Sequence, residues 1–172
     1  MNLYPLKLHL ETPIDDESRD TELHSLLEEA KEDLIVSLGY KFDLIADSVT
    51  ERHDVAKYLY PNIRPIVSVA SVCHNDYPLT EGTDYIVEDR FVRIADVYAE
   101  EIDINDHIDI VYRGGIAETA KEYKPYMEIM VLLVEHRLNR KKETTVRSQQ
   151  YGKETLLDDI NQKIQRLQDK VF

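Results

Sequence analysis

The sequence has a single cysteine, Cys73, no tryptophan and only 5 glycines in 172 residues. One cysteine excludes an internal disulfide and every multi-cysteine metal or iron–sulfur site. The only glycine pair, Gly114-Gly115, precedes no Gly-Lys-Ser element, so there is no phosphate-binding loop, and the Gly-x-Ser-x-Gly nucleophile elbow is missing as well. The longest unbroken apolar run, 129–134, is far below the ~20 residues of a membrane-spanning helix. We expect no membrane span.

The N-terminal residues 1–10 do not resemble a signal peptide. Lys7 is charged and His9 interrupts the apolar residues, so there is no continuous hydrophobic core and no small-residue cleavage site. We therefore expect a protein made in the cytoplasm, and the single cysteine is compatible with that reducing compartment.

Charge is distributed unevenly along the chain. The formal net charge is -13, with 42% hydrophobic and 32% charged residues, which is a globular composition. Dividing the sequence after His136 leaves an acidic part before it and a basic part after it. An acidic body repels nucleic acid, whereas the basic segment either meets an acidic partner or a phosphate, or is simply a solvated loop. Its basic residues are Arg137, Arg140, Lys141, Lys142, Arg147 and Lys153.

Two long helices are expected. Leucines at three- and four-residue steps predict a helix over 21–38, and Gly39 is a plausible left-handed cap. A second helix, 124–140, begins near Pro125 and is apolar on nearly all sides. We expect it to be the central element on which the first helix and a sheet pack, so that a charge at Leu133 unfolds the domain.

Strands are predicted between about 57 and 113. The segment 66–72 alternates β-branched and small residues, 84–94 divides into a hairpin, and 108–112 gives a further strand. Residues 40–60 fit either a short helix or a strand. The expected fold class is α+β: a helical core, made of two long helices plus a C-terminal helix, with a small antiparallel β-sheet insertion.

The C-terminal residues 141–172 are predicted to be a basic linker followed by a helix, set apart from a core domain of residues 1–140. Apolar residues of this helix repeat at three- and four-residue steps and form a narrow seam, which is typical of docking against another helix. It could dock on its own body, on a copy of itself or on a different protein. The seam residues are Leu157, Ile160, Ile164, Leu167 and Val171.

Catalytic chemistry has little support. The six histidines are scattered, with no zinc-ligand spacing. Cys73 and His74 are adjacent on a predicted strand and point to opposite faces, so we interpret Cys73 as packed core. The acidic segment 100–109 does not fit the twelve-residue calcium loop. A metal-dependent hydrolase using carboxylates between Asp84 and Asp109 is an alternative, but no catalytic lysine follows. We expect no catalytic, metal or cofactor-binding residues.

Four stretches, in order, carry a resemblance to a known family. An extended segment and acidic loop precede a Leu-Leu-x-x-Ala helix at 6–34, and a Pro-led strand is followed by a turn and an Asp-Tyr-x-Val strand at 64–87. The strand end IDIVYRGGI lies at 108–116, and a Pro-initiated helix ending in Asn-Arg lies at 123–140. In this arrangement the sequence resembles the head-tail connector (adaptor, head-completion) proteins of long-tailed bacteriophages, in the branch with a β insertion in a helical core.

The resemblance implies a structural, non-enzymatic protein of the virion neck, assembled in the host cytoplasm. Copies of such adaptors form a ring, typically dodecameric, under the portal protein; the ring extends the DNA channel towards a head-closure (stopper) or tail-completion protein. An acidic wall fits a channel through which double-stranded DNA passes without sequence-specific binding. The resemblance also makes the C-terminal segment the candidate for docking to the portal. The residues expected to dock are Arg140, Lys141, Lys142, Arg147, Leu157, Ile160, Ile164, Leu167, Val171 and Phe172.

A second hypothesis comes from a different class of protein. An acidic domain that mimics nucleic acid could bind a basic host protein without forming a ring. A monomer whose binding to a basic host protein depends on salt would favour this host-directed module.

Overall fold

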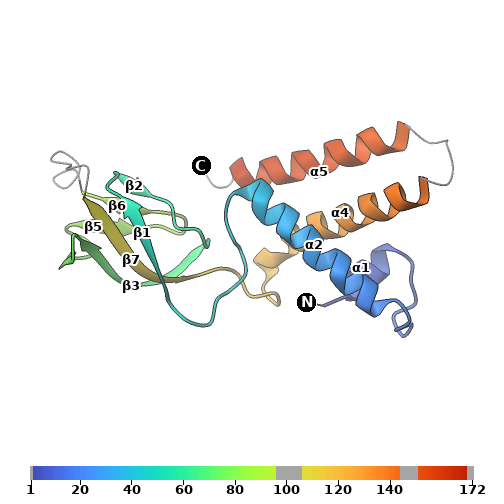
Figure 1. Cartoon of the computed structure of the whole chain (residues 1–172), viewed down its shortest axis with the longest axis horizontal. Helices are drawn as coiled ribbons and strands as arrows, with labels where there is room; N and C mark the ends of the chain where they lie inside the picture. Colours follow the sequence, from blue (N-terminus) through green and yellow to red (C-terminus); the bar gives the residue numbers. More distant parts are fainter. Residues whose placement is uncertain (1, 96–105, 144–150, 170–172) are drawn as a thin grey trace. The chain divides into compact units, whose positions relative to one another are not determined.

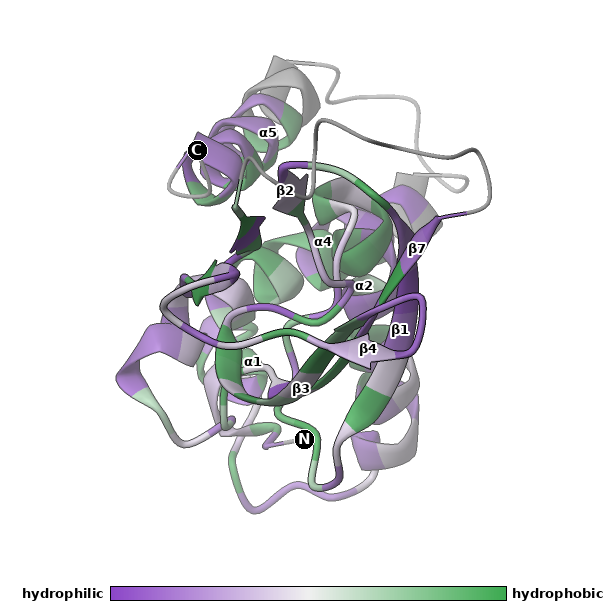
Figure 2. Ribbon diagram, turned by 90° about the vertical axis from the view of Figure 1, so that its left-hand side faces the viewer, coloured by the Kyte–Doolittle hydropathy of each residue, from purple (hydrophilic) through white to green (hydrophobic). Residues whose placement is uncertain are grey.

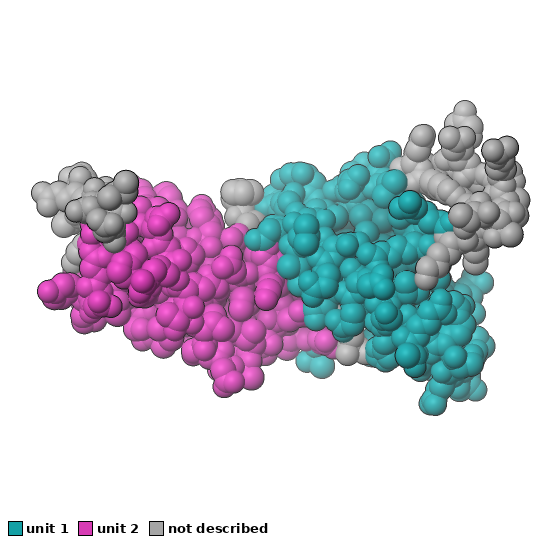
Figure 3. All heavy atoms as spheres, viewed as in Figure 1, with its two compact units in different colours: residues 1–39, 119–172 teal, residues 40–118 magenta. Residues whose placement is uncertain are grey.

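The computed structural model describes residues 2–95, 106–143 and 151–169, without the side chains of 141–143 and 151–155. The chain divides into two compact units (Figures 1 and 3). The helical unit comprises Met1–Gly39 and Thr119–Phe172, and the β unit comprises Tyr40–Glu118. Helices and strands are therefore segregated, and the fold class is α+β, as the sequence predicted.

The helical unit begins with two helices of unequal length. The short α1, Tyr4–His9, was not predicted, whereas the longer α2, Asp20–Leu38, lies where leucine spacing predicted a helix over 21–38. The buried residues of α2 share one side of the helix, and Asp20 and Glu22 in its first turn suit the positive end of the helix dipole. The helix ends at Gly39, whose φ of 75° is a left-handed conformation that glycine adopts readily.

Helix α4, Lys124–Glu143, is the central element of the helical unit (Figure 1). It follows the single-turn η1, Lys121–Tyr123, and packs against α1, α2 and α5. Its fully buried side chains include Ile129, Met130 and Val134. Leu133, at which a charge was expected to unfold the domain, is only half-buried, whereas Met130 is fully buried.

Helix α5, Tyr151–Asp169, belongs to this same unit and packs on α4 and α2. From the sequence, residues 141–172 were expected to be set apart from a core domain of residues 1–140. Burial of part of the apolar seam against the neighbouring helices accounts for its place in the helical unit.

The β unit contains two antiparallel sheets. The four-stranded sheet has the order β1-β7-β3-β4, and the three-stranded sheet has the order β2-β6-β5. The region 40–60, left undecided from the sequence, contributes β1 and β2. The strands are β1 Val49–Asp54, β2 Tyr58–Leu59, β3 Ile66–His74, β4 Tyr77–Pro78, β5 Tyr85–Val87, β6 Val92–Ile94 and β7 His107–Gly114.

Both sheets bury their inner faces in one hydrophobic core. In the central strand β7, Ile108, Ile110 and Tyr112 are fully buried and alternate with more exposed residues. The ribbon of β3 is largely green in Figure 2, as its apolar sequence requires. The sheet was expected to pack on helix 124–140. That expectation is wrong: the buried residues of the strands, from Val55 to Ile94 and from Ile108 to Tyr112, form a core with one another.

A close backbone approach ends β7. Gly115 has a φ of 99°, and a Cβ added there would lie 2.0 Å from the carbonyl oxygen of Asp43. Its N–H donates to the carbonyl of Pro65 at 2.8 Å. Only glycine fits this position, which is why the strand can turn at the Gly114-Gly115 pair.

Candidate docking surfaces

The basic C-terminal end of α4 was one expected docking element. Arg140 is exposed there, and Lys141 and Lys142 continue the helix, although their side chains lie outside the described residues. Arg147 lies outside the described residues altogether. Arg137 is engaged within the helical unit, because its guanidinium pairs with the carboxylates of Glu29 and Asp33 on α2. The basic charge available to a partner therefore begins at Arg140.

The seam of α5 was the other expected element, and the structure uses much of it internally. Ile160 is 2% exposed and Leu167 is 7% exposed, while Ile164 is half-buried. Val171 and Phe172 lie outside the described residues. The Gln168 side-chain amide donates to the Ser37 carbonyl at 2.9 Å, which ties the end of α5 to α2. Of the three arrangements that the sequence left open, the structure shows α5 docked on its own body.

Leu157 differs from the rest of the seam. It is 41% exposed, whereas the described seam residues that follow it along α5 turn inwards. Among the described seam residues, Leu157 is therefore the one with the most exposed side chain, which a partner can reach without displacing α5.

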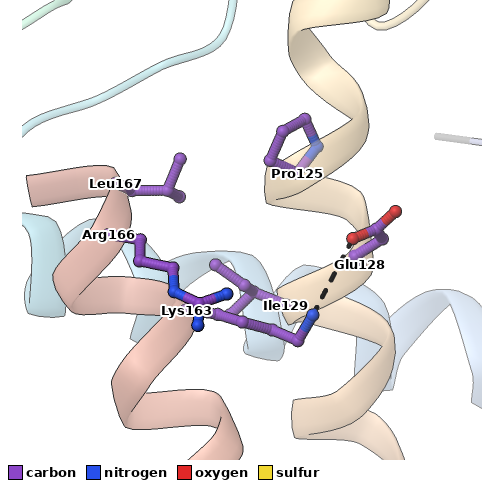
Figure 4. Close-up of a pocket in the computed structure, with 6 residues that line it drawn as sticks. All are labelled: Pro125, Glu128, Ile129, Lys163, Arg166 and Leu167. Atoms are coloured by element: carbon purple, nitrogen blue, oxygen red, sulfur yellow. Dashed lines mark ion pairs between the residues drawn. The ribbon is translucent and has the colours of Figure 1, made fainter. Parts of the chain in front are cut away.

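A small groove separates α4 from α5 (Figure 4). Its apolar floor is formed by Ile129 and Leu167, and a weak ion pair crosses it, since the Lys163 ammonium lies 4.0 Å from the Glu128 carboxylate. The volume is about 140 Å³, well below that of a site for a cofactor-sized ligand. The lining residues are Pro125, Glu128, Ile129, Lys163, Arg166 and Leu167.

One set of side chains in the β unit has the composition of a metal site. Among the described residues, ligand atoms of Asp76, His107 and Asp109 lie within 4.8 Å of one another. However, both oxygens of Asp109 accept hydrogen bonds from the Arg52 guanidinium, at 2.8 Å each. These bonds hold the pKa of Asp109 below its usual value, and they occupy the carboxylate that a cation would need.

The remaining residues considered for catalysis have structural surroundings. Asp84, at one end of the carboxylate range proposed for a hydrolase, accepts the Thr80 N–H at 2.8 Å and so holds a turn. Cys73 and His74 do point to opposite faces, because Cys73 pairs with Asp109 and His74 with the buried Ile108. Cys73 is half-buried on the outer side of the sheet, however, and is not core.

An aromatic cluster on the three-stranded sheet was not predicted from the sequence. The rings of Tyr58 and Tyr60 lie 5.4 and 5.9 Å from that of Phe91. The Arg64 guanidinium lies 5.3 Å from the Tyr60 ring and 5.0 Å from the Tyr40 ring, and its burial lowers the pKa of Arg64. The residues are spread along the sequence, so strand pairing is needed to bring them together.

Comparison with known proteins gives a fold but no sequence family. No family model matches the sequence, and no curated protein matches it. Solved structures do match in fold. Among them are a chain from the neck of an empty GTA particle, computed with C6 symmetry, and a chain from the virion of a native gene transfer agent (GTA) particle. The neck chain has a TM-score of 0.58 at 11% identity, covering 93% of this protein and 88% of that chain. The virion chain has a TM-score of 0.57 at 14% identity, covering 92% and 88%.

The match spans both units, so this chain shares an overall fold with proteins of a gene transfer agent neck and virion. The resemblance to head-tail connector proteins that the sequence suggested is thereby supported in the fold. Among the described helices, none combines the length and apolar character needed to cross a membrane.

Proposed function

We propose that this protein is a structural, non-enzymatic component of a virion neck, an adaptor that forms a ring under the portal and links capsid to tail. The observation that carries the proposal is the fold match to a GTA neck chain, which covers 93% of this protein and 88% of that chain. Because the match covers nearly all of both chains, it includes the helical unit as well as the β unit. It is therefore not limited to one common structural motif.

The ring is the arrangement that a neck favours. The GTA neck was computed with C6 symmetry, and a dodecamer is compatible with sixfold symmetry. The net charge of -13 suits the wall of a channel for double-stranded DNA, because carboxylates repel phosphates and offer no contacts that would hold the duplex. Such a ring would sit between the portal and a head-closure or tail-completion protein.

The geometry of α4 and α5 supports a choice among the expected docking residues. Ile160 and Leu167 are buried against the helical unit, so using them to bind the portal would require α5 to leave its place. Arg140 and Leu157 are exposed and need no rearrangement. We therefore infer that the portal contacts begin with Arg140, Lys141, Lys142 and Leu157, with Arg147, Val171 and Phe172 following along the chain.

Binding to portal protein from the same particle tests this assignment. The triple variant R140E/K141E/K142E is expected to weaken binding by at least tenfold, since three charges change sign at the contact. The variant K121E/K124E is the matched control, because Lys121 and Lys124 are exposed basic residues near the other end of α4. If both variants and the unmodified protein bind the portal equally well, the assignment is contradicted. If the unmodified protein binds a basic host protein and not the portal, the host-directed module is favoured.

A further inference from the structure

The outer face of the three-stranded sheet has the composition of a protein interface. Tyr58 pairs with Arg93 across β2 and β6, and Ile86 pairs with Arg93 across β5 and β6, so the three side chains form one row. Tyr58 is 43% exposed and Ile86 is 38% exposed, while Leu59 and Val92 turn into the core. We call the row, with Tyr60 and Phe91 beside it, the aromatic face.

The contacts within this face favour a fixed surface. Phe91 packs edge-on against Tyr58, with the two ring planes at 87°, and it also touches Tyr60. Arg64, which lies over the Tyr60 ring, donates to the Pro61 carbonyl at 2.7 Å. Ordered Tyr and Arg side chains lose little conformational freedom on binding, and they are the types that contribute most at interfaces.

The outer face of the four-stranded sheet has the opposite character. Ile108, Ile110 and Tyr112 of β7 point into the core, so the residues between them point outwards. The residues of β1 that pair with these outward-pointing residues lie on the same outer face. Asp54 pairs with His107, and Arg52 pairs with Asp109, whose carboxylate it neutralises. With Asp76 in the turn after β3, this surface carries three carboxylates, those of Asp54, Asp76 and Asp109, against two guanidinium groups, those of Arg52 and Arg113. We call Asp54, Asp76, His107 and Asp109 the acidic face.

The two faces point away from each other. Both sheets bury their inner sides in the same core, so the aromatic face and the acidic face lie on opposite sides of the β unit. A ring of identical subunits needs such a pair of surfaces, because a head-to-tail contact uses one patch on each copy and a different patch on its neighbour. Arg93, in the middle of the aromatic face, supplies the positive charge that complements the carboxylates of the acidic face. Glu88 and Asp89 in the β5–β6 turn are at the rim.

We propose that the aromatic face of one copy docks on the acidic face of the next copy, and that this is the contact that closes the ring. The inference rests on the proposed function, which supplies the ring, and deepens it by naming the surfaces. Arg93 meets carboxylates of the neighbour, while Tyr58 and Ile86 bury apolar area against it.

Directed cross-linking tests the contact. In a Cys73→Ser background, Thr50→Cys places a thiol on the outer side of β1 and Ile86→Cys places one on the aromatic face; both positions are exposed. A short bismaleimide should convert the double-cysteine protein into a ladder of oligomers, alone or with the portal present. Each single-cysteine protein should give no cross-linked oligomer, because only one of the two faces then carries a thiol. A ladder missing under both conditions, or dimers from a single-cysteine protein, would overturn the proposal.

A second set of variants separates this contact from the adaptor function. In the double-cysteine protein, Tyr58→Ser or Arg93→Ser should reduce the ladder at least tenfold. Tyr4→Ser, which removes a tyrosine that is similarly exposed on α1, should leave it unchanged. An equal effect of Tyr4→Ser would count against the proposed face. Portal binding without a ladder contradicts only the contact, whereas a ladder without portal binding contradicts only the adaptor function.

Discussion

Lys7 and Asp20 form an ion pair in which the ammonium nitrogen lies 2.6 Å from a carboxylate oxygen of the first residue of α2. Lys7 is 3% exposed, and it also donates to the carbonyls of Ile14 and Asp16, at 3.1 and 2.9 Å. A buried ammonium is stable only when its donors are matched by acceptors, and here the acidic loop supplies them. This one side chain therefore connects α1, the acidic loop and α2.

Replacing Lys7 with methionine should lower the free energy of unfolding by about 2–3 kcal/mol, because three charge-assisted contacts are lost and two carbonyls lose a donor. Denaturant unfolding measures the loss. Lys121→Met, at an exposed position of the same unit, is the control and should change stability by less than about 0.5 kcal/mol. Similar values for the two variants would show that the buried contacts contribute nothing.

The core of α4 should respond to Met130 more than to Leu133. Met130→Ala removes a fully buried side chain and should cost about 2–4 kcal/mol. Leu133 is half-buried, so Leu133→Ala should cost less than half as much. Thermal or denaturant unfolding compares them directly, and an equal loss would mean that Leu133 is more deeply packed than the structure shows.

Undocking of α5 should follow from a charge at Leu167 and not from one at Leu157. Leu167→Asp places a carboxylate at a site that is 7% exposed, which should release the helix and make it sensitive to protease. Leu157→Asp, at 41% exposure, should leave α5 protected while weakening portal binding. Protection of both variants to the same degree would argue against the packing of α5 on α4.

The Tyr112 hydroxyl should make the β unit sensitive to alkaline pH. It donates to Glu51 and accepts the Ile63 N–H at 3.0 Å. Burial, above all, and the Glu51 carboxylate raise the pKa of Tyr112 well above its usual value. Since the folded pKa is the higher one, its contribution to stability is complete below the unfolded pKa of about 10 and falls as the pH rises above it.

Tyr112→Phe provides the comparison for this pH dependence. At pH 7 the variant should be less stable by about 1–2 kcal/mol, because the Ile63 N–H loses its acceptor and Glu51 loses a donor. The difference should shrink between about pH 9.5 and 11, because only the unmodified protein has this group to ionise on unfolding. A difference that is constant over that range would contradict the raised pKa.

The long helices were predictable because their signal is local. Leucine spacing and Gly39 define α2, and the apolar seam with its three- and four-residue steps marks α5. The short α1 has too few residues to show a period. Strand β1 was undecided because its half-buried positions include the polar Glu51 and His53, so it does not show an apolar alternation.

The candidate surfaces were less predictable than the fold. The resemblance to adaptors directed attention to the C-terminal segment, yet no local pattern shows that Ile160 and Leu167 are buried on the chain's own body while Leu157 is exposed. The aromatic face depends on the pairing of Tyr58 with Arg93 and of Arg93 with Ile86, which joins three separate strands. Register of this kind is a tertiary property, and the sequence alone predicted only that a hairpin existed.

The most direct test of the adaptor function is electron microscopy of portal complexes that contain this protein, prepared from components of one particle. The proposal predicts a coaxial ring on the portal, with the end of α4 and Leu157 facing it and the β units in contact around the ring. A portal without added density, even in assembled capsids, or this protein bound as a single off-axis copy, would contradict it.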